Sequence, residues 1–164
     1  MTCNFESEVE IKLDFNHTEL FAEIVNTVME EEKCPYDVTV DLLLTDDEAI
    51  REINKENRDI DASTDVLSFP MNVFPAPGDF SDIENDPDAF DPDSEELMLG
   101  DIVLSQDHIL AQSKEYGHSV KREYAFLIVH SLLHLIGYDH IEDDDRKVME
   151  QHQKDLMEVL NIPR

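Results

Sequence analysis

Three histidines in the C-terminal part of the sequence have the spacing of a metal site. They are His130, His134 and His140, with Gly137 between the second and the third. Residues four apart on a helix lie on one face, so the rings of His130 and His134 can reach one ion. Gly137 can adopt the positive φ that turns the chain back and lets His140 supply a third ligand. Because three protein ligands leave a position open for water, the spacing predicts a catalytic site and favours Zn²⁺ over other divalent transition metals.

The same spacing occurs in the metzincin metalloproteases, which suggests a peptidase as an alternative. Those enzymes place a glutamate directly after the first histidine, and it acts as the general base. This sequence has Ser131 there. Without that carboxylate a peptidase lacks the group that deprotonates its water. The pattern therefore indicates a shared metal centre without the protease chemistry.

Phosphodiesters are a substrate class that suits such a centre. A divalent ion binds a phosphoryl oxygen and lowers the pKa of a water, while a guanidinium stabilises charge on the non-bridging oxygens. The candidate is Arg58, the last basic residue before residues 59–113, which contain neither lysine nor arginine. We predict Arg58 as the transition-state partner, and we count His130 with it as catalytic because it holds the ion.

The surrounding segments have the periodicities of strands and helices. Alternating apolar residues predict four strands, Val9–Phe15, Val38–Leu44, Asp65–Pro70 and Leu97–Leu104. Helical periodicity and caps predict five helices, His17–Lys33, Thr45–Asn57, Ser105–Gly117, Val120–Ile136 and Asp143–Leu160. The fourth helix is apolar on most faces and therefore buried, and in the last helix four residues should face inward: Val148, Leu156, Val159 and Leu160. We expect one α+β domain over residues 1–164, with a four-stranded mixed sheet and about five helices.

Residues 72–96 differ from this pattern in composition. They hold four of the seven prolines and a run of acidic residues. Low hydrophobicity combined with high charge predicts a mobile acidic surface loop rather than a packed element.

The charge of the whole chain limits its partners. The sequence has 40 acidic and 12 basic residues, a net charge of −28. This charge repels phosphate backbones within about a Debye length and, taken alone, argues against a nucleic-acid partner. No apolar run approaches the roughly 18–20 residues of a membrane span, and residues 1–6 lack the start of a signal peptide. We expect a cytoplasmic protein with neither a membrane nor DNA as partner.

Four blocks of the sequence, in order, resemble the YbeY family of bacterial endoribonucleases, also called rRNA maturation factors. The blocks are Ile53–Arg58, Ser63–Pro70, Leu99–Val103 and the histidine segment His130–His140, which ends in Gly137-Tyr138-Asp139-His140. The family usually has glycine where this chain has Ser131, and commonly Lys-Asp-x-Pro where it has Ile60–Ser63. The acidic loop of this chain, residues 75–96, is also longer than is usual in the family.

The resemblance implies a mixed sheet surrounded by helices and a metal-dependent endoribonuclease specific for single-stranded RNA. It implies action in maturation of the 16S rRNA 3′ end and in ribosome quality control, with the ribosome or small-subunit proteins as partners. It also implies that His130, His134 and His140 bind zinc and that Arg58 is needed for activity.

Several alternatives stay open at this stage. The protein could be a metallohydrolase acting on a small molecule or a peptide, or a non-catalytic zinc protein that docks on the ribosome. The general base could be water activated by the metal, Asp139 or the 2′-hydroxyl of the RNA, and Asp139 could instead orient a ligand histidine. Because the chain is so acidic, we expect it to bind free RNA weakly, with ribosomal partners delivering the substrate.

Overall fold

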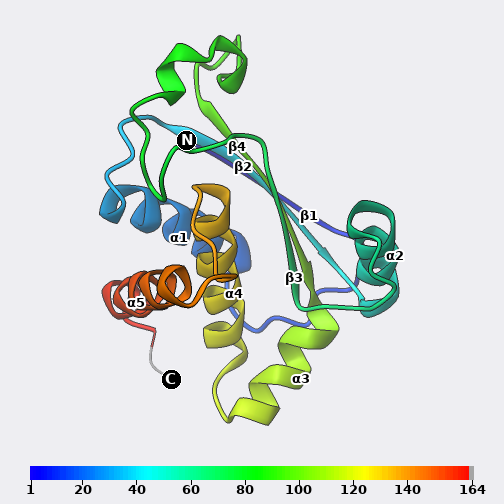
Figure 1. Cartoon of the computed structure of the whole chain (residues 1–164). Helices are drawn as coiled ribbons and strands as arrows, with labels where there is room; N and C mark the ends of the chain where they lie inside the picture. The colour runs from blue at the N-terminus through cyan, green and yellow to red at the C-terminus, as the bar shows by residue number, and fades with distance from the viewer. Residues whose placement is uncertain (163–164) are drawn as a thin grey trace.

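A single mixed sheet of four strands organises the computed structural model, which describes residues 1–162 (Figure 1). The order across the sheet is β1 (Thr2–Ser7), β2 (Val38–Thr45), β4 (Leu97–Ser105) and β3 (Val66–Pro70). The pairs β1–β2 and β2–β4 are parallel, whereas β3 runs antiparallel to β4. The predicted α+β class with a four-stranded mixed sheet is therefore confirmed.

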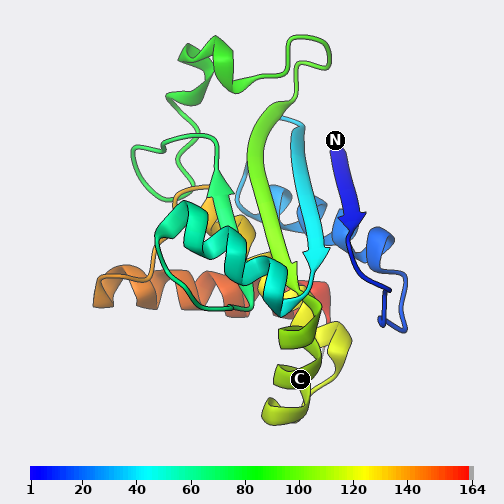
Figure 2. The same cartoon turned by 90° about the vertical axis from the view of Figure 1, so that its right-hand side faces the viewer.

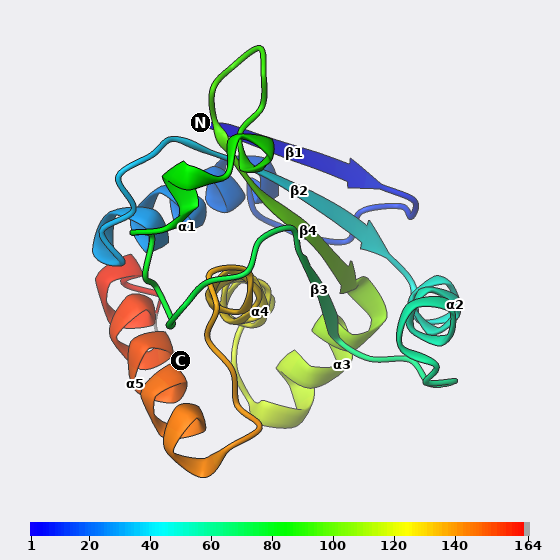
Figure 3. The ribbon, with the colours of Figure 1, turned by 45° about the horizontal axis from the view of Figure 1, so that its top comes forward.

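Five helices surround this sheet, as predicted. They are α1 (His17–Glu31), α2 (Asp47–Arg58), α3 (Gln106–Tyr116), α4 (Val120–Leu135) and α5 (Asp143–Leu160). Helices α1, α4 and α5 lie on one side of the sheet and α2 lies on the other (Figures 1 and 2). Viewed along its axis, α4 is central, with α1, α5, α3 and β3 around it (Figure 3). Among residues 1–162, no helix combines the length and hydrophobicity that crossing a membrane requires.

Helix α4 is the buried central element that its apolar sequence predicts. Tyr124, Ile128, Leu132 and Leu135 are all fully buried. The hydroxyl of Tyr124 donates a hydrogen bond of 2.8 Å to the carbonyl of His17 and so ties α4 to α1. Because α4 is fixed on several sides, side chains in its last two turns have a rigid support.

The first strand lies earlier in the chain than predicted. The Val9–Phe15 strand is wrong, because residues 8–16 contain no strand and β1 is Thr2–Ser7. At this edge of the sheet, backbone pairing with β2 decides the strand, and only Cys3 and Phe5 of β1 pack toward the core. Of the alternating apolar residues that suggested a strand, Val9, Leu13 and Phe15 pack against the core from a loop, and Ile11 is exposed.

Helix α5 has the predicted bounds, but half of its predicted inner face is wrong. Leu156 and Leu160 are buried, whereas Val148 and Val159 are about half exposed. The buried face is offset by one residue from the predicted face at its beginning, since it starts at Met149 rather than Val148. Its members are Met149, Gln153, Leu156, Met157 and Leu160. A polar residue, Gln153, thus occupies a core-facing position that hydrophobicity could not indicate.

The acidic segment of residues 72–96 packs against the core, so the prediction of an unpacked loop is wrong. Phe80, Ile83 and Ala89 are buried, and the segment contains two short 3₁₀ turns, Ile83–Asn85 and Pro87–Ala89. Three apolar anchors are enough to fix it, although its average composition is that of a disordered chain. Most of its carboxylates stay at the surface.

A β-bulge bends β4 where β3 ends. Thr39 pairs with Met98 and Val40 pairs with Gly100, so Leu99 is the extra residue. Gly100 has φ 140°, and a Cβ atom there would lie 2.1 Å from the carbonyl oxygen of Phe69. Only glycine therefore allows β3 to approach β4 at this point.

Replacing Gly100 with alanine is expected to destabilise the fold by about 3 kcal/mol, because the added Cβ forces the two strands apart. Urea denaturation measures the change. Gly117→Ala is the matched control, since Gly117 also has a positive φ of 69° but nothing lies within 4 Å of its added Cβ. The control should lose only about 1 kcal/mol. Equal losses in the two variants would contradict the steric explanation.

Candidate metal centre

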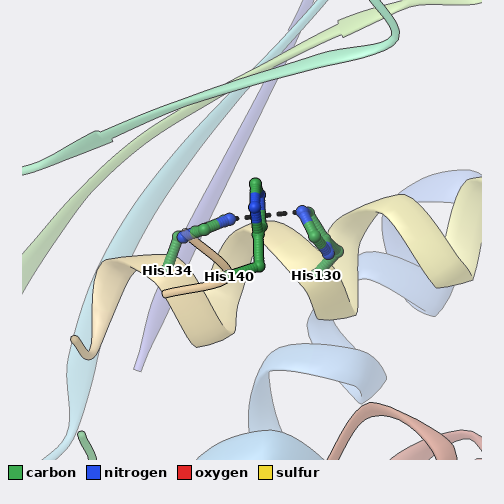
Figure 4. A group of neighbouring side chains, drawn as sticks. All are labelled: His130, His134 and His140. Carbon is green, nitrogen blue, oxygen red and sulfur yellow. Dashed lines mark hydrogen bonds between the residues drawn. The ribbon is translucent and has the colours of Figure 1, made fainter. Parts of the chain in front are cut away.

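The three predicted histidines meet at the end of α4. His130 and His134 project from its last two turns, and His140 returns from the loop that follows (Figure 4). One nitrogen from each ring lies within 4.8 Å of the other two. His130 and His134 are partly buried, whereas His140 is exposed. The spacing in the sequence thus correctly predicted that the rings converge.

The geometry of the two helical rings fits a bound cation. Their Nε2 atoms are 3.2 Å apart. Ligand bonds of about 2.0–2.1 Å at a tetrahedral angle place two nitrogens about 3.3 Å apart, so the separation suits zinc without rearrangement.

Hydrogen bonds on the far side of each ring determine which nitrogen faces the cluster. Nδ1 of His134 lies 3.0 Å from the carbonyl oxygen of Tyr138, which can only accept. Nδ1 of His130 lies 3.5 Å from the side-chain oxygen of Gln153, a longer contact of the same kind. Each Nδ1 therefore carries the proton, and both Nε2 lone pairs point at each other. Two lone pairs at this distance repel unless a proton or a metal ion lies between them.

The backbone after α4 is turned and held by specific contacts. Gly137 has φ 102°, and a Cβ there would lie 3.0 Å from Cβ of Phe74. The N–H of Tyr138 donates to the carbonyl of Leu133 at 3.0 Å, which closes the helix end. The carboxylate of Asp139 accepts the backbone N–H of His140 at 2.7 Å. Asp139 thus fixes the loop backbone, and no hydrogen bond within residues 1–162 joins it to a histidine ring.

The side chain of Tyr138 anchors this loop in the interior. Its hydroxyl donates to Glu32 at 2.9 Å, and Nδ1 of His152 lies 2.7 Å from the other oxygen of that carboxylate. Burial, followed by the Glu32 carboxylate, raises the pKa of the Tyr138 hydroxyl, so it remains a neutral donor. The carbonyl that orients His134 therefore belongs to a residue tied to both α1 and α5. No sequence motif pointed to Glu32, His152 or Gln153, because Glu32 caps the end of α1 and the other two lie on α5, far from the histidines in the sequence.

Ser131, the residue in place of the metzincin glutamate, is fully buried. Its hydroxyl oxygen lies 2.6 Å from that of Ser68 on β3. This contact joins α4 to the strand beside the histidines.

The histidines open into a cleft of about 670 Å³ that also contains Arg58. Arg58 is the last residue of α2 and is exposed. Within residues 1–162, no hydrogen bond or ion pair engages its guanidinium. The cleft is lined further by polar side chains that the spacing argument did not select: Thr64, Asp65, Ser68 and Asn72. The structure thus brings Arg58 and the three histidines into one cleft, and their roles in catalysis and metal binding stay predictions.

Burial keeps two of the imidazoles neutral near physiological pH. It is the main cause that lowers the pKa of His134 to about 4, and the neighbouring rings of His130 and His140 add to the effect. Burial also lowers the pKa of His130. A neutral imidazole is the form that binds a metal, so these rings need not lose a proton first.

Binding of zinc at pH 6 is therefore expected to release few protons. Three imidazoles with the ordinary pKa of 6.5 would together release about 2.3 protons at that pH, whereas His134, with a pKa of about 4, releases almost none. The lowered pKa of His130 reduces the number further. Calorimetric titration with zinc in two buffers of different ionisation enthalpy measures the release. A value above about two would contradict the lowered pKa values.

Comparison with known proteins gives one consistent result. The family model described as Endoribonuclease YbeY matches residues 2–161. Curated proteins named Endoribonuclease YbeY from Lachnoclostridium phytofermentans and Agathobacter rectalis are each 50% identical over 165 residues, covering 100% of both chains. A Clostridium botulinum protein of the same name is 40% identical over 157 residues, covering 94% of this chain and 95% of its own.

Among solved structures, the solution structure of a Thermotoga maritima protein is similar to this chain. The TM-score is 0.57 at 24% identity, covering 96% of this chain and 87% of the other. At this identity the similarity supports the fold alone.

Proposed function

Because this chain belongs to the YbeY family of endoribonucleases, we propose that it is a zinc-dependent endoribonuclease specific for single-stranded RNA. We propose further that it acts in the cytoplasm on rRNA, in maturation of the 16S rRNA 3′ end and in ribosome quality control. The observation that carries the proposal is the shared cleft, in which three convergent imidazoles lie with an arginine that no side chain of residues 1–162 engages. An anion binder beside a metal site is the arrangement that phosphodiester cleavage requires.

His130, His134 and His140 would hold the ion through one ring nitrogen each. A zinc ion bound there supplies a Lewis acid that polarises a phosphoryl oxygen and lowers the pKa of a water. The carbonyl of Tyr138 and the amide of Gln153 keep the Nε2 atoms of the two helical rings directed at the ion.

Arg58 supplies the charge that the phosphate needs. Its guanidinium donates two parallel hydrogen bonds to non-bridging oxygens and so stabilises the charge that develops at phosphorus. Asp65 and Asp139 are the two carboxylates that line the cleft and could accept a proton from the attacking group, and Asp139 also accepts the backbone N–H of His140. The carboxylate of Asp65 is oriented by the N–H of Val66 at 2.7 Å.

The direct test compares strands of RNA. The zinc-loaded protein is incubated with a labelled single strand, with the same strand in a duplex, and with both after chelation and zinc return. Cleavage of the single strand alone, abolished by the chelator and restored by zinc, is the expected result. Equal cleavage of both forms, or no cleavage of either by protein shown to contain zinc, would overturn the proposal. If zinc-loaded protein cleaves neither form, the remaining alternatives are a hydrolase acting on a small molecule or a peptide, and a non-catalytic zinc protein.

A further inference from the structure

The two most exposed large apolar side chains of residues 1–162 both line the histidine cleft. Val73 is 93% exposed and Ile141 is 78% exposed. The remaining exposed apolar side chains of this part of the chain reach at most 59%. Exposing aliphatic surface to water is unfavourable, and when it gathers at a cleft it marks a place where a ligand covers it.

These two side chains come from different chain segments that line the cleft. Ile141 directly follows His140 in the loop after α4. Val73 lies on the segment after β3, next to Phe74, which packs close to Gly137 of the same loop. Two chain segments that meet beside the metal site therefore each contribute one exposed aliphatic side chain to the cleft.

The side chains that line the cleft attract a phosphate backbone only weakly. Besides the ion proposed for the three histidines, Arg58 is the one lysine or arginine that residues 1–162 contribute to the lining, and Asp65 and Asp139 oppose its charge. The net charge of −28 adds long-range repulsion. A ligand with several phosphates must therefore be held mainly by its uncharged parts.

We propose that Val73 and Ile141 bind the nucleobases on either side of the scissile phosphodiester. This inference rests on the proposed cleavage of RNA. The bases offer flat apolar faces that cover the two aliphatic side chains, while Arg58 binds the single phosphate that reacts. Bases in a duplex are stacked and paired, so their faces are not accessible to the cleft. The preference for unpaired RNA then arises from contacts with bases rather than from attraction to phosphates.

Two substitutions and two matched controls test this assignment. Val73→Ser and Ile141→Ser remove the apolar contact, and Val148→Ser and Val159→Ser make the same kind of change at half-exposed positions of α5 that do not line the cleft. Cleavage of a short single-stranded RNA should show KM raised by about fivefold in each cleft variant, with kcat within about twofold. Both controls should match the unmodified protein.

Substrates that lack a base identify the contact itself. For the unmodified protein, KM should be higher on a substrate with an abasic nucleotide next to the cleaved bond. On the substrate that lacks the base contacted by Val73 or Ile141, the serine variant of that residue should not raise KM further. Salt gives a second readout, because a single phosphate contact predicts that KM rises less than about threefold between about 50 and 200 mM salt. KM values of the cleft variants equal to those of the controls, or a salt dependence corresponding to several phosphates, would overturn the inference.

A binding measurement separates this inference from the proposed function. The four variants are titrated with a fluorescent single strand and followed by anisotropy, which requires no turnover. If the unmodified protein cleaves no RNA, the proposed function fails, and weaker binding by Val73→Ser and Ile141→Ser alone still supports the base contacts. If all variants bind alike, the base contacts fail whether or not RNA is cleaved.

Discussion

Replacement of Arg58 with alanine is expected to lower kcat/KM for single-stranded RNA by about 10²–10³-fold, the usual effect of removing one preorganised donor to a developing anion. Arg58 lies in the cleft with the histidines and is the one lysine or arginine that the described residues contribute to its lining. Arg58→Lys should recover only part of the activity, because an ammonium keeps the charge but not the paired donors. Steady-state cleavage of a labelled RNA measures both effects.

Arg51→Ala is the matched control for this experiment. Arg51 lies on the same helix, is likewise exposed and is paired with Asp61 at 2.6 Å outside the cleft. Its loss changes the net charge by the same amount, so a general electrostatic effect would appear equally in both variants. Activity of Arg58→Ala within about threefold of Arg51→Ala would exclude the proposed role of Arg58.

Replacement of His134 with alanine is expected to weaken zinc binding by at least about 10³-fold, because one of three ligands is lost. Metal analysis after dialysis should then find less than about 0.1 zinc per chain, against about one in the unmodified protein. Zinc at about one hundred times its Kd adds about 2.7 kcal/mol of stability. This corresponds to a rise in Tm of roughly 5–10 °C for a chain of this length, and the variant should show none of it.

His108→Ala serves as the control for histidine removal. His108 lies on α3 and contacts Asp47, away from the cleft. Its variant should keep both the zinc content and the zinc-induced rise in Tm. Full zinc occupancy in His134→Ala would show that the ion binds elsewhere and would overturn the site assignment.

The site was more predictable from the sequence than the elements around it. Two histidines one turn apart on a helix need only local geometry to converge, and Gly137 needs only its positive φ. The partners of the rings could not be predicted in this way, since Gln153 and the Tyr138–Glu32–His152 contacts join three helices. Such contacts depend on how α1, α4 and α5 pack, which no spacing in the sequence expresses.

The errors in the fold have a common physical origin. Periodicity reports only which side chains are apolar. Strand β1 forms because its backbone pairs with β2. Residues 72–96 are fixed by a few buried apolar side chains within an otherwise acidic sequence. In both places the decisive contacts are long-range. Averages over a local window therefore predicted a strand where the chain forms a loop, and an unpacked loop where the segment packs against the core.

The acidic segment is attached to the site only at its beginning. Phe74 packs beside Gly137, and the N–H of Gly78 donates to the carbonyl of Ile136 at 2.9 Å. Residues 79–95 do not line the cleft. Beyond Gly78 the segment contacts the core but not the cleft, so its exposed acidic positions can change while its buried anchors and the chemistry stay fixed. Divergence among relatives should concentrate there.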